Sequence, residues 1–499
     1  MLAAASGSAQ ACELIANRPI VGGTAATVRT PGTLPPVLRR ARLFVVVFLF
    51  VAAATLAGLA FTGNDGPPSF GPVVVDPGEP DPFAYDPERE DEFVDRATAG
   101  HSHVLYAKSP GGAVATARRV ERRRPAIERA AGVTGFDADL LEAIVFLESA
   151  GSPSARASDD LEGAVGLTQI LAGTATTLLG MRVDVAASER LTRLMRRRGP
   201  SARLLRKSRE VDERFDPRKA LAGAVHYLEI ADERFGRGDL AIVSYHMGMG
   251  NLENVLDEYG DPDAGWAQAY FDATPSNHPR AYALLSGFGD DSASYLWRVY
   301  AARQIMRLYR EDPGELRRLA RLQTAKASAE EVLHPSSSTK RFESPADLER
   351  AYQLGELRPF EGVRGMRLDP QAGELAGRLD AEPSLYHGLR PDAYELAVYL
   401  AAGVRGVSGA RAPLTVTSTV RDQEYQRVLA RGNPFATREY SLHTTGFTFD
   451  VRRDYASRAQ AVAFQYMLDR LQSLDLIAWI REPGAIHITA SSEDGKLVQ

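Results

Sequence analysis

Cysteine is almost absent from this chain of 499 residues, since Cys12 is the only one. Disulfide bonds within the chain are therefore impossible, and a structural zinc site built from several cysteines is excluded as well. A strong charge of one sign is also lacking, because 59 Lys and Arg face 64 Asp and Glu, for a formal net charge of −5. This balance argues against a nucleic-acid partner. The length suffices for two or three domains that each bury a core.

A single long hydrophobic run occurs at residues 43–61, where 19 residues carry no charge. As a helix it would span roughly 28 Å, about the thickness of the hydrocarbon core of a bilayer. Arg39, Arg40 and Arg42 precede it, and none of the next 25 residues is basic. The positive-inside rule then predicts a transmembrane anchor with a cytoplasmic N-terminus and the remaining chain on the other side of the membrane. The alternatives are a buried helix of a soluble domain and a cleaved signal peptide, since 57–60 supplies small residues.

Composition divides the chain into segments. Residues 1–42 are rich in Ala, Gly, Thr and Pro without sustained periodicity, which predicts a disordered cytoplasmic tail. Residues 62–112 begin with a stretch dense in Gly, Pro and Asp, which is typical of an extended linker. Residues 326–345 predict a second linker, with Ser, Pro and mixed charges but few apolar residues. These boundaries leave two folded domains, 113–325 and 346–499.

The two folded segments differ in hydrophobic periodicity. From about 114 to 323 the apolar spacing is helical throughout, with no convincing strand. The last segment mixes helical stretches at 346–355, 391–403 and 457–474 with short β-like runs at 414–420, 447–451 and 485–489. We therefore expect a multidomain protein, in which an all-α domain and then an α+β domain follow an N-terminal transmembrane helix.

One carboxylate of the helical segment, Glu148, closes the apolar face of a predicted helix. Asp137 is a good N-cap, and the face is formed at helical spacing by Leu141, Ile144 and Val145. A carboxyl in that position is partly desolvated, which raises its pKa. A carboxyl that is protonated near neutral pH can protonate the leaving oxygen of a glycosidic bond. Taken alone, however, a Glu at a helix end is more often a boundary residue than a catalytic one.

Three motifs resemble, in order, those of the soluble-lytic-transglycosylase family, whose fold is a helical relative of goose-type lysozyme. They are FLESAGSPSA at 146–155, GAVGLTQI at 163–170 and AIVSYHMGMGN at 241–251. His246 and Met247 depart from the Asn and Ala of the family's third motif, which puts the local hydrogen bonding there in doubt but not the fold. The resemblance covers about 130–310 and implies a lysozyme-like domain that cuts the glycan strands of peptidoglycan without a cofactor.

The resemblance also implies a role for each matching residue. Glu148 would act first as acid and then as base, and Ser149 would hydrogen-bond the substrate beside it. Gln169 would line the sugar cleft. Tyr245 would form a hydrogen bond near Glu148 and help to orient it. The simpler account of the glycines in these motifs is turn geometry, which the functional account needs as well.

The reaction type depends on whether a second carboxylate is present. Inverting hydrolysis uses one several ångströms away to activate water, and retaining hydrolysis uses a closer one as nucleophile. The only carboxylates close after Glu148 are Asp159, Asp160 and Glu162, in a loop-like stretch where we expect them to be solvated. The resemblance implies lytic cleavage of the MurNAc-GlcNAc β-1,4 bond instead, in which the sugar's C6 hydroxyl attacks and gives a 1,6-anhydro product. Lysozyme-type hydrolysis is the alternative.

A basic insertion at 188–215 separates the second motif from the third. Its ordinary interpretation is a solvated helical hairpin. The alternative is a contact with acidic polymers of the cell wall, because clustered basic side chains attract polyanions.

Polar residues of the C-terminal segment form a candidate metal site. On the predicted strands 447–451 and 485–489, Asp450 and His487 point away from the apolar side chains that face the core. Together with His443 they offer two imidazoles and one carboxylate, which suits a zinc site with one open position for water. Without further context, such a set is more often scattered polar residues.

The pattern SxHxxGxxxD at 441–450 resembles the zinc D-Ala-D-Ala carboxypeptidase and endopeptidase family, over about 385–490. The resemblance implies that zinc is bound by His443, Asp450 and His487. It also implies that the domain cleaves, or at least recognises, the peptide stems of peptidoglycan.

The resemblance assigns two further residues. Arg421, in a run similar to the family's strand and Arg, would hold the substrate carboxylate. The family usually places a catalytic Glu three residues before the last His, where this chain has Gly484. Glu482, five residues before that His, is the candidate substitute. The alternative is an inactive wall-binding domain that retains the fold.

These expectations combine into a bifunctional wall enzyme, tethered to the cell membrane with its catalytic domains outside the cytoplasm. Peptidoglycan is the expected partner, and zinc is the expected cofactor of the C-terminal domain alone. A different class of answer is an envelope scaffold in which both domains are degenerate. The intact acid and the matching motif residues argue against it.

Overall fold

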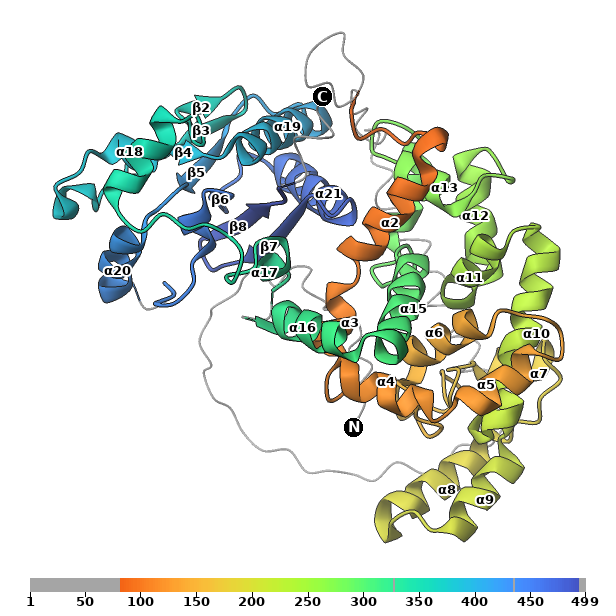
Figure 1. Cartoon of the computed structure of the whole chain (residues 1–499). Coiled ribbons are helices and arrows are strands. Elements are labelled where there is room, and N and C mark those ends of the chain that lie inside the picture. Colours follow the sequence, from red (N-terminus) through yellow and green to blue (C-terminus); the bar gives the residue numbers. More distant parts are fainter. Residues whose placement is uncertain (1–80, 326–327, 434–435, 493–499) are drawn as a thin grey trace, which may run out of the picture. The chain divides into compact units, whose positions relative to one another are not determined.

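The computed structural model describes residues 81–325, 328–433 and 436–492. A helical part precedes a mixed α/β part (Figure 1), as the hydrophobic periodicity predicts. Within the described residues, no helix combines the length and the apolar character needed to cross a membrane. The predicted tail and the predicted anchor at 43–61 lie outside the described residues.

The helical part consists of η1 (Pro87–Arg89), α2 (Glu90–Gly100), α3 (His103–Lys108), α4 (Ala113–Glu121), α5 (Arg124–Ala131), α6 (Ala138–Ser149), α7 (Ala172–Thr177), α8 (Val185–Arg198), α9 (Ala202–Val211), η2 (Glu213–Phe215), α10 (Pro217–Phe235), α11 (Gly238–Met247), α12 (Met249–Tyr259), α13 (Trp266–Asp272), α14 (Pro279–Gly287), α15 (Tyr295–Glu311) and α16 (Pro313–Thr324). Among the described residues, the expectation of no strand holds except for isolated bridges that join Val165 to Arg156 and to Ile170, and Val183 to Asp212.

Helix α6 is the central helix of this part and forms for the reasons visible in its sequence. The Asp137 side chain accepts hydrogen bonds from the first free amides of the helix, as an N-cap does. The apolar residues on its buried face, Leu141, Ile144 and Val145, are completely buried. They pack against α4, α5 and α15. The helix ends where Ala150 adopts a left-handed conformation with φ of 49°.

The segment 62–112, expected to be an extended linker, is helical from Pro87 onward, so that expectation was wrong for this stretch. In α2, Phe93 and Ala97 are buried, one helical turn apart. The helix packs against α13 and α15. Few apolar residues are enough here because Phe93 and Ala97 occupy core positions. The Gly and Pro density that suggested a linker ends before η1 begins.

A buried ion pair holds the loop that contains the second motif. The Arg214 guanidinium is fully buried and lies 2.9 Å from the Asp212 carboxylate, which is fully buried too. It also donates hydrogen bonds to three backbone carbonyls of the loop, those of Leu161, Gly163 and Ile170. Buried charges persist only when they are paired and hydrogen-bonded in this way.

The α/β part contains α17 (Glu330–Leu333), α18 (Pro345–Gln353), β1 (Arg358–Pro359), β2 (Gly362–Val363), β3 (Met366–Leu368), η4 (Ala376–Leu379), η5 (Pro383–Tyr386), β4 (Gly388–Leu389), α19 (Pro391–Ser408), β5 (Leu414–Ser418), α20 (Gln423–Gly432), η6 (Leu442–Thr445), β6 (Thr448–Arg452), α21 (Arg458–Ser473), β7 (Ile477–Arg481) and β8 (Ala485–Ala490). The larger sheet has the order β2-β3-β5-β6-β8-β7, and only the β3–β5 pair is parallel.

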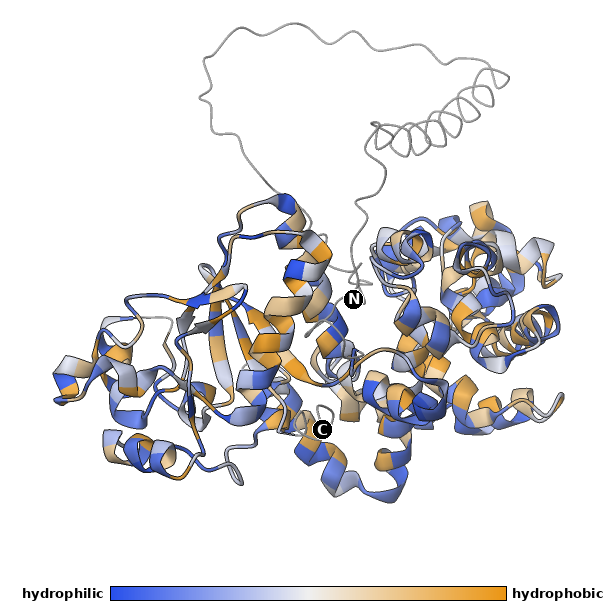
Figure 2. Ribbon diagram, turned by 90° about the horizontal axis from the view of Figure 1, so that it is seen from above, coloured by the Kyte–Doolittle hydropathy of each residue, from blue (hydrophilic) through white to orange (hydrophobic). Residues whose placement is uncertain are grey.

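The two faces of this sheet differ in polarity. On β6 and β8, Phe449, Val451, Ile486 and Ile488 are buried, as their alternation predicts. Helices α19 and α21 pack on each other and against strands of the sheet, and Figure 2 shows the apolar strands beneath them. The polar residues of the same strands project from the opposite face.

Residues 326–345, expected to form a linker, pack against the sheet where they are described. Glu330 and His334 are 2% and 3% exposed. The His334 ring stacks on Phe447 with ring centroids 4.0 Å apart. Phe342 is buried in a cluster of apolar side chains. The expectation failed because these contacts depend on isolated polar and aromatic residues, which composition does not reveal.

Candidate functional site

Glu148 lies in the last turn of α6 and is half-buried. Its Oε1 accepts a hydrogen bond of 2.7 Å from the hydroxyl of Tyr295, the first residue of α15. The packing of α15 along α6 brings these two residues together from 147 positions apart in the sequence.

The surroundings of Glu148 favour a protonated carboxyl. Burial raises the pKa of Glu148 above its ordinary value, and this effect outweighs the opposing influence of His246 and of the Tyr295 hydroxyl. No second carboxylate acts on Glu148 among the described residues. The pKa of Tyr295 is raised well above its ordinary value by burial and by the negative charge of Glu148, so this tyrosine keeps its proton and donates it to the hydrogen bond.

His246 supports the tyrosine that contacts Glu148. Its ring stacks on Tyr295 with centroids 5.0 Å apart and an interplanar angle of 26°. Its Nδ1 lies 3.0 Å from the Ser292 hydroxyl. Where the family has Asn, this chain thus has a histidine that contacts Tyr295 and Ser292. Sequence reasoning missed Tyr295, because helical spacing marks it only as a core residue of its own helix.

Tyr245 and Gln169 belong to the same neighbourhood but do not contact Glu148 through a hydrogen bond. The Tyr245 hydroxyl donates to the carbonyl of Thr168 at 2.8 Å, and the negative charge of Glu148 adds to the burial that raises the pKa of Tyr245. Gln169 has a φ of 49°, unusual for a residue other than glycine, and its side-chain amide donates to the carbonyl of Gly166. Such backbone strain clusters at functional sites. The orienting role of Tyr245 and the sugar contact of Gln169 remain predictions.

Ser149 lies beside Glu148 in sequence but points into the protein. It is 1% exposed, and its hydroxyl donates to the carbonyl of Val145 within α6. A hydrogen bond from Ser149 to a substrate would require this internal bond to break, so the predicted role remains a prediction.

The carboxylates that follow Glu148 are solvated, as expected. Asp159, Asp160 and Glu162 are all exposed, and Asp159 pairs with Arg196 at 2.6 Å. Their positions match the expectation for loop residues and give none of them a contact with Glu148.

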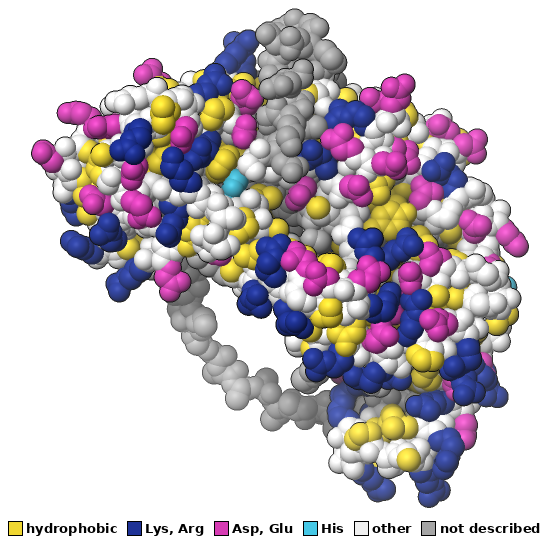
Figure 3. All heavy atoms as spheres, in the orientation of Figure 1, with side chains coloured by type: hydrophobic (Ala, Val, Ile, Leu, Met, Phe, Trp, Pro, Cys, Tyr) yellow, Lys and Arg dark blue, Asp and Glu magenta, His cyan; other side chains and the backbone are white. Residues whose placement is uncertain are grey.

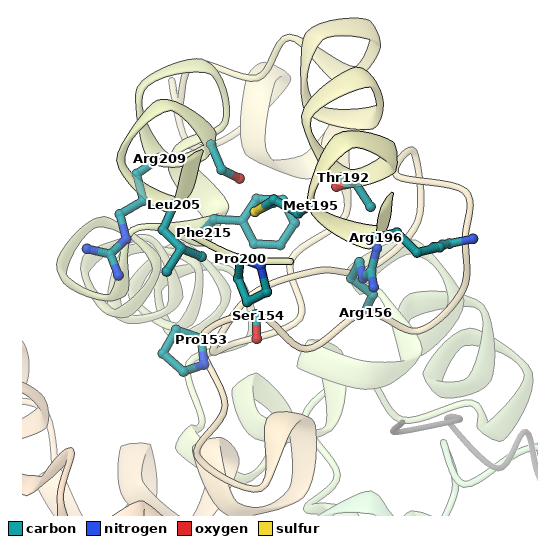
Figure 4. A pocket seen from close by; sticks show the side chains of 11 residues that line it. Pro153, Ser154, Arg156, Thr192, Met195, Arg196, Pro200, Leu205, Arg209 and Phe215 are labelled. Atoms are coloured by element: carbon teal, nitrogen blue, oxygen red, sulfur yellow. The ribbon is translucent and has the colours of Figure 1, made fainter. Parts of the chain in front are cut away.

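The basic insertion forms a helical hairpin, α8 and α9, as its ordinary interpretation predicts. Lys and Arg side chains surround it on the face shown in Figure 3. Between the hairpin and the loop after Glu148 lies a cavity of about 410 Å³, with Met195 and Leu205 on the hairpin side and Pro153 and Ser154 on the loop side (Figure 4). Glu148 is not among the residues that line this cavity.

The three predicted metal ligands come together on the polar face of the sheet. Asp450 on β6 and His487 on β8 are cross-strand partners, and Asp450 Oδ1 lies 2.7 Å from His487 Nδ1. His443, in η6, places its Nε2 3.1 Å from Asp450 Oδ2. All three ligand atoms lie within 4.8 Å of one another.

Each imidazole is held from behind by an acceptor. His443 Nδ1 donates to the carbonyl of Thr419 at 2.7 Å, which leaves its Nε2 facing Asp450. His487 Nε2 lies 3.1 Å from the carboxylate of Glu330, which leaves its Nδ1 facing Asp450. Sequence reasoning missed Glu330, because it lies in the segment taken for a linker.

The charges in this cluster are strongly coupled. Burial and the charge of Arg421 lower the pKa of His443 to about 4, so its ring is neutral at neutral pH. Burial would raise the pKa of Asp450, but the two imidazoles hold it well below its ordinary value. For His487, burial is outweighed by Glu330 and Asp450, which raise its pKa to about 10.

Arg421 and Glu482 border the cluster. The Arg421 guanidinium lies 3.4 Å from Asp450 Oδ2 and donates to the Ser418 hydroxyl. Glu482 is exposed in the turn between β7 and β8, and partial desolvation together with the charge of Asp450 raises its pKa. Both are therefore near the site, while their contacts with a substrate remain predictions.

The donor set fits a divalent metal ion. Bonds of about 2.0–2.1 Å to zinc place tetrahedral ligand atoms roughly 3.3 Å apart. The Asp450 carboxylate lies 3.1 Å from His443 and 2.7 Å from His487, and the three ligand atoms all lie within 4.8 Å of one another. The acceptors behind the two rings direct one ring nitrogen of each histidine toward the carboxylate, and a metal ion bound there would displace the proton that His487 carries on Nδ1. Metal-binding histidines are typically held by such a second hydrogen bond. The residues could therefore hold a metal ion.

Replacement of Glu148 by Gln is expected to stabilise the protein at pH 7, by on the order of 1 kcal/mol, because folding at that pH must otherwise either bury the charge of this carboxyl or bind a proton to it. The folded-state pKa is raised, so the charge destabilises the fold above that pKa and has no effect below the unfolded value of about 4.3. Thermal unfolding from pH 4 to pH 8 measures this. The gain should vanish toward pH 4, and Glu162→Gln, at an exposed site, should show none. A gain independent of pH would contradict the argument.

Comparison with known proteins supports one of the two domain expectations. Residues 125–265 match the family model described as the Transglycosylase SLT domain. The match contains Glu148, Gln169 and Tyr245 and ends before Tyr295. A comparison with the curated proteins found no match. The helical part thus contains an SLT domain, which implies lytic transglycosylase activity on peptidoglycan, whereas no match supports a zinc peptidase family for the α/β part.

Proposed function

We propose that this protein cleaves the MurNAc-GlcNAc β-1,4 bond of peptidoglycan as a lytic transglycosylase, with Glu148 as the catalytic acid and base. The observation that carries the proposal is the half-buried Glu148 carboxyl with its raised pKa, hydrogen-bonded to Tyr295 inside an SLT domain. A carboxyl whose pKa is raised in this way holds its proton to higher pH and is better suited to donate it to a glycosidic oxygen.

In the first step, Glu148 gives its proton to the glycosidic oxygen as the bond from C1 to that oxygen breaks. The sugar ring then carries positive charge, and the Glu148 carboxylate accepts a hydrogen bond from Tyr295 while it is ionised. In the second step, the C6 hydroxyl of the same sugar attacks C1. Its proton passes to Glu148, which restores the acid and leaves a 1,6-anhydro ring.

The absence of a second carboxylate near Glu148 in the described part of the chain favours this route over hydrolysis. Inverting hydrolysis needs a base about 6.5–9.5 Å from the acid, and retaining hydrolysis needs a nucleophile about 5 Å away. Asp159, Asp160 and Glu162 are exposed, and one of them is already paired with Arg196. An internal hydroxyl as nucleophile requires neither partner.

Replacement of Glu148 by Gln is expected to lower the rate of glycan cleavage by at least about 100-fold, because general acid catalysis contributes on this scale. Mass spectrometry of digested sacculi should find 1,6-anhydromuramyl ends with the native chain. Asp160→Asn and Glu162→Gln serve as matched controls and should retain activity. Products with reducing ends in place of anhydro ends would contradict the lytic route and favour lysozyme-type hydrolysis.

We also propose that the protein is anchored in the cell membrane by residues 43–61, with its catalytic parts on the outer side. The length of the uncharged run and the arginines before it support this. Export also places the enzyme on the side of the membrane where peptidoglycan lies.

Removal of residues 43–61 is expected to move the protein from the membrane fraction to the soluble fraction. The native chain should resist extraction by high salt and yield to detergent, because an inserted helix is held by apolar contacts. A native chain that is shortened at 57–60 on export, and is then found free of membranes, would favour the cleaved signal peptide instead.

A second activity is supported by a specific observation in the α/β part. Two histidines, each with an acceptor behind its ring, and one carboxylate converge on the polar face of the sheet. A zinc ion bound there would activate water and polarise the carbonyl of a stem peptide. Arg421 would pair with the substrate carboxylate, and the carboxyl of Glu482, beside the cluster, would transfer protons. We propose zinc-dependent cleavage of stem peptides, with a wall-binding role as the alternative.

Chelation is expected to abolish peptide cleavage and leave glycan cleavage unchanged, because only the α/β part has a candidate metal site among the described residues. Asp450→Asn should also lose bound zinc, measured by metal analysis of the full chain. His226→Ala, an exposed histidine on α10, is the control and should keep it. Zinc bound without any release of D-Ala or of stem peptides would favour the wall-binding alternative.

A further inference from the structure

Glu330 is a buried carboxylate that the proposed activities leave without a role. It begins α17, which packs against β7 and β8 (Figure 1), and it is 2% exposed. Its Oε1 accepts a hydrogen bond of 2.9 Å from the Thr489 hydroxyl, and its Oε2 accepts one of 3.0 Å from the Ser328 hydroxyl. The remaining neighbour is His487, with Nε2 at 3.1 Å from Oε1.

The two hydroxyl contacts do not explain why a charged residue occupies this position. A neutral amide would accept the same hydrogen bonds, and burial of a carboxylate is unfavourable unless a positive or strongly polarised donor compensates it. His487 supplies that donor.

The contact with Glu330 determines which nitrogen of His487 faces the cluster. One ring nitrogen lies against Glu330, and the other lies 2.7 Å from Asp450. His443 has the same arrangement, with the carbonyl of Thr419 behind it at 2.7 Å. Each histidine therefore has an acceptor behind it and directs its other nitrogen toward Asp450.

We propose that Glu330 is a positioning residue of the metal site: it holds His487 at Nε2–H and so directs Nδ1 toward a divalent metal ion that His443 and Asp450 also bind. The inference rests on the proposed metal site and adds a residue from outside the segment that carries the other ligands. With Glu330, helix α17 becomes part of the proposed metal site.

The experiment compares zinc affinity in the full chain and in Glu330→Gln and Glu330→Ala variants, by competition with a chromogenic chelator. Glu330→Gln should bind zinc about 10–100-fold more weakly, as is usual when the partner behind a metal-bound histidine is altered. Glu330→Ala, which also loses the acceptor, should bind more weakly still. Glu331→Gln, the next residue of the same helix, is the matched control and should bind as the native chain does.

Thermal unfolding without zinc separates positioning from packing. Lower stability together with native zinc affinity in both Glu330 variants would show a structural role and overturn the proposal. If the native chain binds no stoichiometric zinc, the metal site itself is overturned, and the proposal with it. That outcome is distinguishable, because the Glu331→Gln control would then lack zinc as well, while glycan cleavage by Glu148 would persist.

Discussion

A carboxyl enclosed at the end of α6, with a single tyrosine hydroxyl as its partner, is the constraint on which the helical part depends. Burial disfavours the charged form of Glu148, and the hydrogen bond from Tyr295 offsets part of the cost of burying this carboxyl. Both conditions require α15 to pack along α6, and the stacked ring of His246 holds the tyrosine in place. The packing that stabilises the domain is thus the same packing that prepares an acid.

In the α/β part, the surroundings stabilise ionised side chains instead of a protonated carboxyl. Its polar cluster contains charges of both signs, and each side chain has more than one partner: Asp450 contacts both histidines and Arg421. Such a network favours ionised carboxylates rather than a neutral acid. The surroundings thus decide what each carboxyl can do. Glu148, half-buried beside tyrosines and His246, is suited to donate a proton. Asp450, paired with two histidines and Arg421, is suited to bind a cation.

Local patterns predicted the features that local physics determines. The helix of Glu148, its cap at Asp137 and the outward positions of Asp450 and His487 all follow from periods of 3.6 and 2 residues. The sequence did not reveal Tyr295, Glu330 or the Arg214–Asp212 pair in the same way. Their roles arise from contacts between segments far apart in the chain, or from burial that a polar composition conceals. The two segments taken for linkers were predicted wrongly for the second reason, since only a few of their residues are buried and the rest are polar.

The described residues between the helical part and the sheet are packed against the α/β part, unlike those of a flexible linker. Helix α16 ends at Thr324, and Ser328 is already buried with its hydroxyl on Glu330. Four Cα–Cα steps separate these residues, and a chain of that length reaches at most about 14 Å. His334 and Phe342 then hold the following residues against the sheet. Glu330, the residue proposed to position His487, therefore follows α16 closely in the sequence and belongs to a segment that packs against the sheet.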